Sequence, residues 1–218
     1  AASFEHYIGA VHEHTGYSDG TLNTRPGDVF AQVSERGYDF AISTEHSDNT
    51  HLPLTVTGDC ASEQLLECVI ADDDDPLNSF IKWEATADQA ESATTDSFTA
   101  IRGFEWTSDR FGHINVIFSD HVINAKTTAG YAVSMADFWQ WFLYPAQFGG
   151  GANALLSFNH PGREDAIEEI VNYLGVSDPA YTFNQFRYVP GADYRTVGLE
   201  VFGKGSKYDA GGPGGSWL

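Results

Sequence analysis

The chain has 218 residues, enough for one domain with a large core or at most two small ones. Its hydrophobic content of 42% and aromatic content of 14% argue against a disordered protein. The 31 Asp and Glu residues outnumber the 11 Lys and Arg residues, giving a formal net charge of -20. Such a surface repels nucleic acid and anionic membranes and favours divalent cations, which argues against a general nucleic-acid binder. No apolar run approaches the roughly 18 residues of a membrane span.

The first expected strand is the apolar run from Tyr7 to Val11, and His12 and His14 follow it. Residues two apart in an extended chain point to the same face, so we expect the two imidazoles to project together. A turn at residues 17–20 should bring Asp19 back toward them. Two imidazoles and a carboxylate are the start of a nitrogen and oxygen metal site. An exposed histidine pair explains the short motif H-x-H about equally well when it is taken alone.

A β-α-β unit follows this motif. A helix should begin with Thr24 as its N-cap and Pro26 in its first turn, and it should end at Gly37. Residues 39–43 then form a buried strand that leads into His46. In α/β barrels the carboxyl ends of the strands form the face where chemistry occurs, so His46 is a candidate functional residue.

Residues 47–78 lack periodicity, and we interpret them as an acidic insertion. Cys60 and Cys68 have no histidine beside them, which argues against a zinc site. We expect a local disulfide within this insertion, and two unpaired thiols are the alternative. A disulfide favours a secreted or extracellular protein. The aspartates at 72–75 lack the ligand spacing and the glycine of a calcium loop, so a solvated loop is the preferred reading.

The rest of the chain alternates between strands and helices. A helix from Ser79 carries an apolar face suited to core packing. We expect strands over residues 98–106, 112–118, 154–158 and 196–202, helices over residues 134–144 and 164–174, and a glycine-rich tail over 203–218. The whole chain is therefore predicted to be a single α/β domain with six recognisable strands.

Acidic or histidine side chains recur where these apolar runs begin or end. Glu105 belongs to the strand over 98–106, His113 begins the next strand, and His160 follows the strand over 154–158. The full candidate set is His12, His14, Asp19, His46, Glu105, His113 and His160. One such histidine is ordinarily a hydrogen-bonded surface or core residue, but that reading does not explain all of them together. The set predicts a metal site at one end of the strands.

The motifs resemble those of the PHP family, named for polymerase and histidinol phosphatase domains. The resemblance runs from about residue 7 to residue 202 and rests on the following motifs: H-x-H after the first strand, Tyr17-Ser18-Asp19-Gly20, Thr44-Glu45-His46, Glu105 at a strand end, His113, and Asn159-His160-Pro161. It implies a distorted seven-stranded β/α barrel that holds two or three divalent metal ions, often zinc, manganese or iron. It also implies hydrolysis of phosphoesters.

The resemblance further implies a role for each ligand. His12, His14 and Glu105 would hold one metal ion, and Glu105 would bridge to a second held by His113 and His160. Asp19 and His46 would serve a third.

The implied reaction is hydrolysis of a phosphate mono- or diester in a small phosphorylated substrate by a metal-activated water. Arg110, Arg163 and Lys82 are candidate cations for the phosphate; surface ion pairing is their alternative role. A non-catalytic metal-binding or assembly module with the same fold is the alternative function. A metal hydrolase acting on other esters is a third reading.

Two departures from the family pattern stand out. The usual Thr-Asp-His is Thr44-Glu45-His46 in this chain, and the late Asp-x-His of the family occurs nowhere in the 218 residues. The six recognisable strands are also one fewer than the seven of the resembling fold. We therefore expect the last strand or strands, with the remaining ligands, to come from a further C-terminal segment or from a partner chain.

Overall fold

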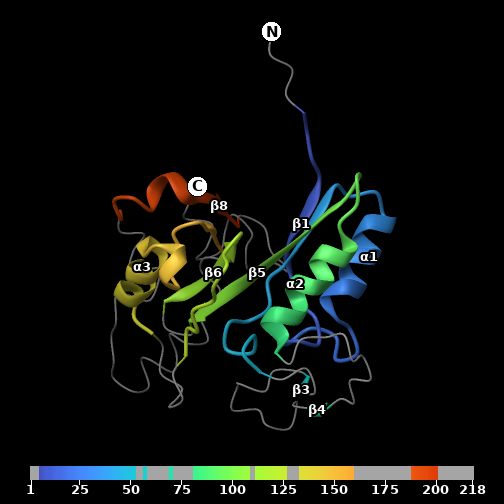
Figure 1. Cartoon of the computed structure of the whole chain (residues 1–218), viewed down its shortest axis with the longest axis horizontal. Helices are drawn as coiled ribbons and strands as arrows, with labels where there is room; N and C mark the ends of the chain where they lie inside the picture. Colours follow the sequence, from blue (N-terminus) through green and yellow to red (C-terminus); the bar gives the residue numbers. More distant parts are fainter. Residues whose placement is uncertain are drawn as a thin grey trace, which may run out of the picture. The chain divides into compact units, whose positions relative to one another are not determined.

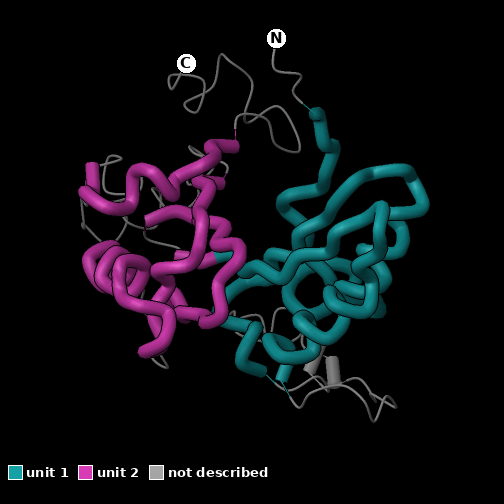
Figure 2. Tube along the Cα trace, turned by 45° about the horizontal axis from the view of Figure 1, so that its top comes forward, with its two compact units in different colours: residues 1–105 teal, residues 106–218 magenta. Residues whose placement is uncertain are grey.

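The computed structural model describes residues 5–52, 56–57, 69–70, 81–108, 111–126, 133–159 and 188–200, and it has a mixed α/β fold (Figure 1). Several sequence predictions lie outside these residues: Cys60, Cys68, Arg110, His160, Arg163, the helix over 164–174 and the glycine-rich tail. The chain forms two compact units, residues 1–105 and 106–218 (Figure 2). No helix in the described part of the chain is both long enough and apolar enough to cross a membrane.

The first unit combines parallel strands with two helices that lie side by side (Figure 1). Its elements are β1 (Gly9–Glu13), α1 (Pro26–Glu35), β2 (Phe40–Ser43), α2 (Lys82–Ala93) and β5 (Thr99–Ser108), with a short antiparallel pair β3 (Val56–Thr57) and β4 (Val69–Ile70). β1 pairs with β2 and β2 with β5, both in parallel. The predicted β-α-β unit is therefore confirmed.

The ends of α1 follow from its sequence, with one correction. Pro26 is the first helical residue, and the residue before it, Arg25, takes the N-cap position, so the prediction of Thr24 is wrong. The backbone N–H of Arg25 donates to the Asp28 carboxylate at 2.8 Å, and this contact fixes the start of the helix. At the other end Gly37 has a φ of 81°, a left-handed conformation that glycine adopts without steric cost. The prediction that Gly37 ends the helix is confirmed.

The core of the first unit lies between its helices and its strands. The buried side chains are Phe30 and Val33 of α1, Ala41 of β2, Ala90 of α2, Phe98 just before β5, and Ala100 of β5. Small residues on the strands leave room for the Phe30 ring, which is only 1% exposed. This packing holds the three strands in register and so fixes the positions of the residues at their carboxyl ends.

Replacing Phe30 with alanine should destabilise the protein by about 3–5 kcal/mol, because the vacated ring volume cannot be refilled by Ala41 or Ala100. Chemical denaturation followed by circular dichroism measures this change. Leu22→Ala is the matched control, since Leu22 is 41% exposed and should lose less than about 1 kcal/mol. Equal losses in the two variants would contradict this description of the core.

β1 departs from a regular strand. Its pairing with β2 shifts register between Ala10 and Glu13, so His12 lies within an irregularity. The strand begins at Gly9 rather than at Tyr7, and the side chains of Tyr7 and Ile8 are 66% and 64% exposed. The predicted strand is therefore present but begins two residues later.

The turn after β2 caps α2. The backbone N–H groups of Lys82 and Trp83 at the start of the helix donate to the carbonyls of Leu52 and Thr50, at 3.1 and 2.8 Å. The helix begins three residues later than Ser79, the start predicted from its periodicity. Residues 47–50 are buried, so the first residues of the predicted insertion pack within the first unit.

The second unit contains β6 (Gly112–Ile117), α3 (Met135–Leu143), β7 (Leu155–Phe158) and β8 (Thr196–Leu199), with short 3-10 turns at Ala146–Phe148 and Asp193–Arg195. β6 is antiparallel to β7, and β7 is parallel to β8. The order of hydrogen-bonded neighbours in the sheet is β1-β2-β5-β6-β7-β8, and β5 contributes residues to both units. The six strands predicted from the sequence are all present.

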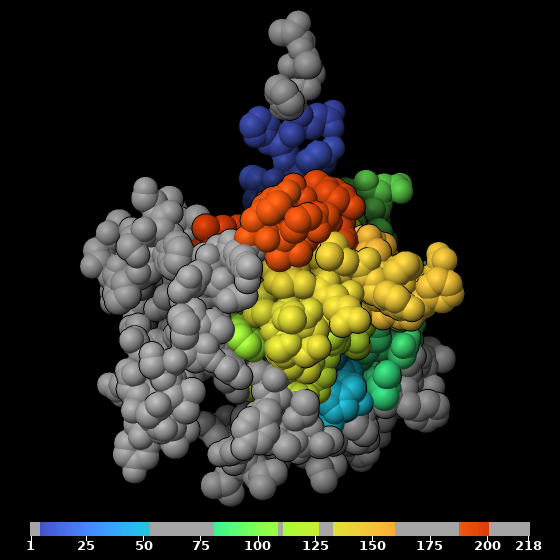
Figure 3. Space-filling view, turned by 90° about the vertical axis from the view of Figure 1, so that its left-hand side faces the viewer, coloured from blue at the N-terminus to red at the C-terminus, as the bar shows by residue number. Residues whose placement is uncertain are grey.

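Residues 188–200 lie beside α3 within the second unit (Figure 3). Arg195 makes this contact: its guanidinium is buried and donates to the carbonyls of Phe142, Gly151 and Ala154 at 2.9, 2.8 and 3.2 Å. The guanidinium also lies 3.9 Å from the centroid of the Phe142 ring. Arg195 therefore connects the segment just before β8 with the end of α3 and with the residues just before β7.

Candidate metal centre

The Glu105 carboxylate is the centre of a cluster of histidines in the first unit. Glu105 is fully buried on β5. Its Oε1 lies 3.1 Å from Nε2 of His12, and its Oε2 lies 3.1 Å from Nδ1 of His46 and 3.7 Å from Nε2 of His14. The two carboxylate oxygens thus face different imidazoles, as a carboxylate that bridges two cations would.

Asp19 extends the cluster toward solvent. Its Oδ1 lies 3.2 Å from Nε2 of His46 and 3.4 Å from Nδ1 of His14, while its side chain is 48% exposed. The ring centroids of His12 and His14 are 5.0 Å apart, and those of His14 and His46 are 4.6 Å apart. The predicted convergence of His12, His14 and Asp19 is present in the structure, and one side of the cluster is open to solvent.

The parallel strands explain why these residues meet. β2 and β5 run in the same direction, and a further parallel bridge joins His46 to Glu105 beyond the end of β2. The backbone supports this bridge, because Glu105 N–H donates to the carbonyl of Glu45 at 2.9 Å and Ser47 N–H donates to that of Glu105 at 2.8 Å. Strand pairing therefore brings residues far apart in sequence together. His46 follows the end of β2 as predicted, whereas Glu105 lies within β5, which continues to Ser108.

Two groups in this unit have the geometry to hold a metal ion. The first is His12, His14 and Glu105, and the second is His14, Asp19 and His46; in each group the ligand atoms lie within 4.8 Å of one another. Imidazole nitrogen and carboxylate oxygen suit zinc, manganese and iron. The buried Glu105 carboxylate among imidazoles fits such a cation, because a buried anion needs a positive partner.

No family model matches this sequence, and no curated protein matches it. The site is therefore interpreted from its own geometry.

The protonation of the cluster also suits a metal site. Burial lowers the pKa of His14 to about 4, so its imidazole is neutral near pH 7, as a ligand must be. Burial also tends to lower the pKa of His46, but its hydrogen bonds to Asp19 and Glu105 hold that pKa well above the usual range. Burial raises the pKa of Asp19, yet the hydrogen bond and charge of His46 hold it far below its usual value. Asp19 and His46 therefore form an ion pair in the metal-free protein, and a bound metal would displace the His46 proton.

Glu45 was not identified as a functional residue from the sequence. Its buried carboxylate does not join the histidine cluster but accepts hydrogen bonds from Thr15 N–H at 3.0 Å, from the Thr15 hydroxyl at 2.5 Å and from the Ser18 hydroxyl. Burial raises the pKa of Glu45, and these hydrogen bonds oppose the rise. The carboxylate fixes the turn that carries Asp19. The departure from Thr-Asp-His was the only sequence signal for this role.

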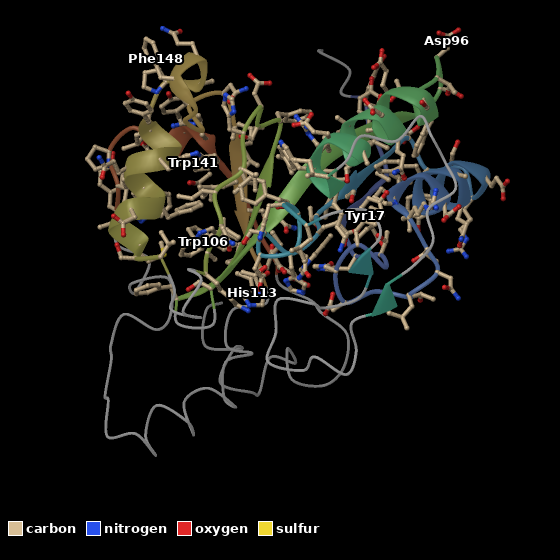
Figure 4. The ribbon with its side chains drawn as sticks, turned by 60° about the horizontal axis from the view of Figure 1, so that its bottom comes forward. Tyr17, Asp96, Trp106, His113, Trp141 and Phe148 are labelled. Atoms are coloured by element: carbon tan, nitrogen blue, oxygen red, sulfur yellow. The ribbon has the colours of Figure 1, made fainter. Side chains whose placement is uncertain are left out.

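Lys82 is a structural residue, and the prediction that it binds phosphate or forms a surface ion pair is wrong. It is 1% exposed, and its Nζ donates to the carbonyl of Tyr17 at 2.7 Å. Tyr17 lies in the same unit, at the turn after β1 (Figure 4). The Tyr17 hydroxyl accepts a hydrogen bond from the Gln89 amide at 2.8 Å, so α2 holds this turn at two points.

The other predicted site residues are His113, His160, Arg110 and Arg163. His113 is the second residue of β6 in the second unit, and its carbonyl accepts a hydrogen bond from Asn159 N–H at 3.0 Å, which places the start of β6 beside the end of β7. Because β6 is antiparallel to β7, its first residue meets the carboxyl end of its neighbour. His160, Arg110 and Arg163 fall outside the described ranges. Their predicted roles stay predictions.

Proposed function

We propose that this chain is a metal-dependent phosphoesterase that hydrolyses a phosphate mono- or diester in a small substrate. The observation that carries the proposal is the buried Glu105 carboxylate, which contacts imidazole nitrogens of His12, His14 and His46 at 3.1 to 3.7 Å. A buried acid that touches three histidines serves a packed core poorly, whereas it suits a multi-metal site.

The chemistry of the site would come from two or three divalent ions, zinc, manganese or iron, which neutralise phosphate oxygens and lower the pKa of a bound water. His12, His14 and Glu105 would hold one ion. His46 and Asp19 would hold another, with the half-exposed Asp19 at the side from which a substrate can approach. The resemblance assigns His113 and His160, together with the bridging Glu105, to a further ion. Arg110 and Arg163 are candidate cations for the phosphate, and all these roles are sequence predictions.

In this proposal the fold is a distorted seven-stranded β/α barrel of the PHP type. The six paired strands and the cluster, with Glu105 on β5 and His46 beyond the end of β2, support it, and the antiparallel β6 is an exception to a regular β/α barrel. The seventh strand and the missing Asp-x-His would then come from a further segment or a partner chain.

The alternative function is a non-catalytic metal-binding or assembly module. One observation favours it: two cations of the first unit are engaged in internal contacts. Lys82 is buried against Tyr17, and the Arg102 guanidinium lies 3.8 Å from the centroid of the Trp83 ring. Hydrolysis of p-nitrophenyl phosphate and bis(p-nitrophenyl) phosphate, with added zinc or manganese and with a chelator, separates the two functions. Metal binding without hydrolysis of any phosphoester tested would favour the module.

The secreted location is also a proposal, and Cys60 and Cys68 provide its test. Closing the short loop between them costs little chain entropy, so we expect a disulfide in protein isolated without reductant. Alkylation without reduction, followed by mass spectrometry, should leave both cysteines unmodified. Two alkylated thiols would remove the main support for secretion.

A further inference from the structure

Ser18 lies between a buried carboxylate and a candidate metal ligand. Its Oγ contacts Oε2 of Glu45 on one side and lies 3.3 Å from Nδ1 of His14 on the other. Both Ser18 and Glu45 are buried, so water does not compete for these contacts. These contacts link Glu45 to His14 through Ser18. They thus connect the turn after β1 with the cluster around Glu105.

The direction of these hydrogen bonds follows from the donors around Glu45. The Thr15 N–H and the Thr15 hydroxyl both donate to the carboxylate, at 3.0 and 2.5 Å from Oε1, and the Thr15 N–H also lies 3.2 Å from Oε2. Ser18 completes the set at Oε2. In this geometry the Glu45 oxygens are the acceptors, and the Ser18 hydroxyl is the donor in its contact with Oε2. The single hydroxyl proton of Ser18 is therefore directed at Glu45.

Because the Ser18 hydroxyl proton is donated to Glu45, Ser18 can only accept a hydrogen bond from His14. The proton of a neutral His14 ring must then lie on Nδ1. The other polar neighbour of this nitrogen agrees, since Oδ1 of Asp19 is 3.4 Å away and is also an acceptor. The lone pair of the ring is left on Nε2, which faces Oε2 of Glu105 at 3.7 Å.

We propose that Glu45 and Ser18 act as positioning residues that fix the tautomer of His14 and reserve its Nε2 for the metal ion beside Glu105. His14 then serves with His12 and Glu105, and its protonated Nδ1 is not available to the group of Asp19 and His46. Groups that hydrogen-bond to the far side of a ligating imidazole orient the ring and raise its basicity. The inference rests on the metal-binding part of the proposed function and does not require hydrolysis.

The test determines which ring nitrogen of His14 carries the proton. The ¹⁵N chemical shifts of the ring, recorded on the metal-free protein at neutral pH, give this tautomer. In the wild type Nδ1 should carry the proton. In Glu45→Gln the oxygen of the amide can still accept from Thr15 while its NH₂ donates to Ser18, so the Ser18 proton turns to His14. The variant should therefore show the proton on Nε2, and its affinity for zinc, measured by calorimetry, should fall about 10- to 100-fold.

Two further variants keep the test decisive. Ser18→Ala removes the connection without changing Glu45, so it should also weaken zinc binding even if Glu45→Gln fails to fold. Thr86→Ala is the control, because its buried hydroxyl donates to the carbonyl of Lys82 in the same unit and does not touch the cluster. It should lose comparable stability with unchanged tautomer and affinity. A wild-type proton on Nε2, or unchanged zinc affinity in both Ser18→Ala and Glu45→Gln, would overturn the inference. A chain that hydrolyses no phosphoester but shows the tautomer reversal would refute the proposed function alone.

Discussion

Glu105→Gln is expected to abolish metal-dependent hydrolysis and to lower the metal content of the chain by more than one ion. The two oxygens of Glu105 face different histidines, His12 at Oε1 and His46 at Oε2. An amide has the same shape but offers one neutral acceptor, so it cannot compensate the charge of two cations. Loss of a group that hydrogen-bonds to a metal ligand costs about 10- to 100-fold in metal affinity or activity, so loss of the bridging ligand itself should cost at least about 100-fold in activity.

Elemental analysis of the purified variant and its steady-state rate with a p-nitrophenyl phosphate substrate measure both effects. Glu91→Gln is the matched control, since Glu91 is an exposed residue of α2 and should change neither quantity. Thermal unfolding of each variant separates loss of ligand from loss of fold. If Glu105→Gln kept its full metal content, the bridging role of Glu105 would be wrong.

His46→Ala should remove the ion shared with Asp19 and leave the ion held by His12, His14 and Glu105. The imidazole of His46 joins the two carboxylates, with Nε2 at 3.2 Å from Asp19 and Nδ1 at 3.1 Å from Glu105. Without it the half-exposed Asp19 is a single carboxylate, which holds a divalent ion weakly. We expect the metal content to fall by about one ion and the rate to fall about 100-fold.

His6→Ala serves as the control for this variant, because His6 is exposed and lies before β1. Parallel metal analysis of the two variants gives the comparison. A loss of all metal in His46→Ala would show that the two groups do not fill independently.

Strand positions and strand-end residues were predictable from the sequence because they depend on local patterns. Apolar runs located all six paired strands, and the β-α-β rule placed His46 and Glu105 at one edge. Gly37 was predictable for the same reason, since ending a helix with a positive φ is a local requirement.

The features that sequence reasoning missed depend on contacts between distant segments. Lysine is ordinarily a surface residue, but the buried ammonium group of Lys82 donates a hydrogen bond to the carbonyl of Tyr17, 65 residues away. Glu45 adjoins the candidate ligand His46 in sequence, yet its carboxylate accepts hydrogen bonds from Thr15 and Ser18, 30 and 27 residues away. The N-cap of α1 was misplaced by one residue because Asp28 selects Arg25 through its backbone N–H, and helix ends are the least reliable part of a sequence pattern.

The central claim is that His12, His14, Asp19, His46 and Glu105 form a multi-metal centre. The most direct measurement is elemental analysis of the full chain after equilibration with zinc or manganese and removal of free metal, together with a calorimetric titration of the metal-free protein. We predict two or three bound divalent ions per chain, with at least two lost in Glu105→Gln. A chain that retains no divalent ion and shows no binding heat with either metal would contradict the account.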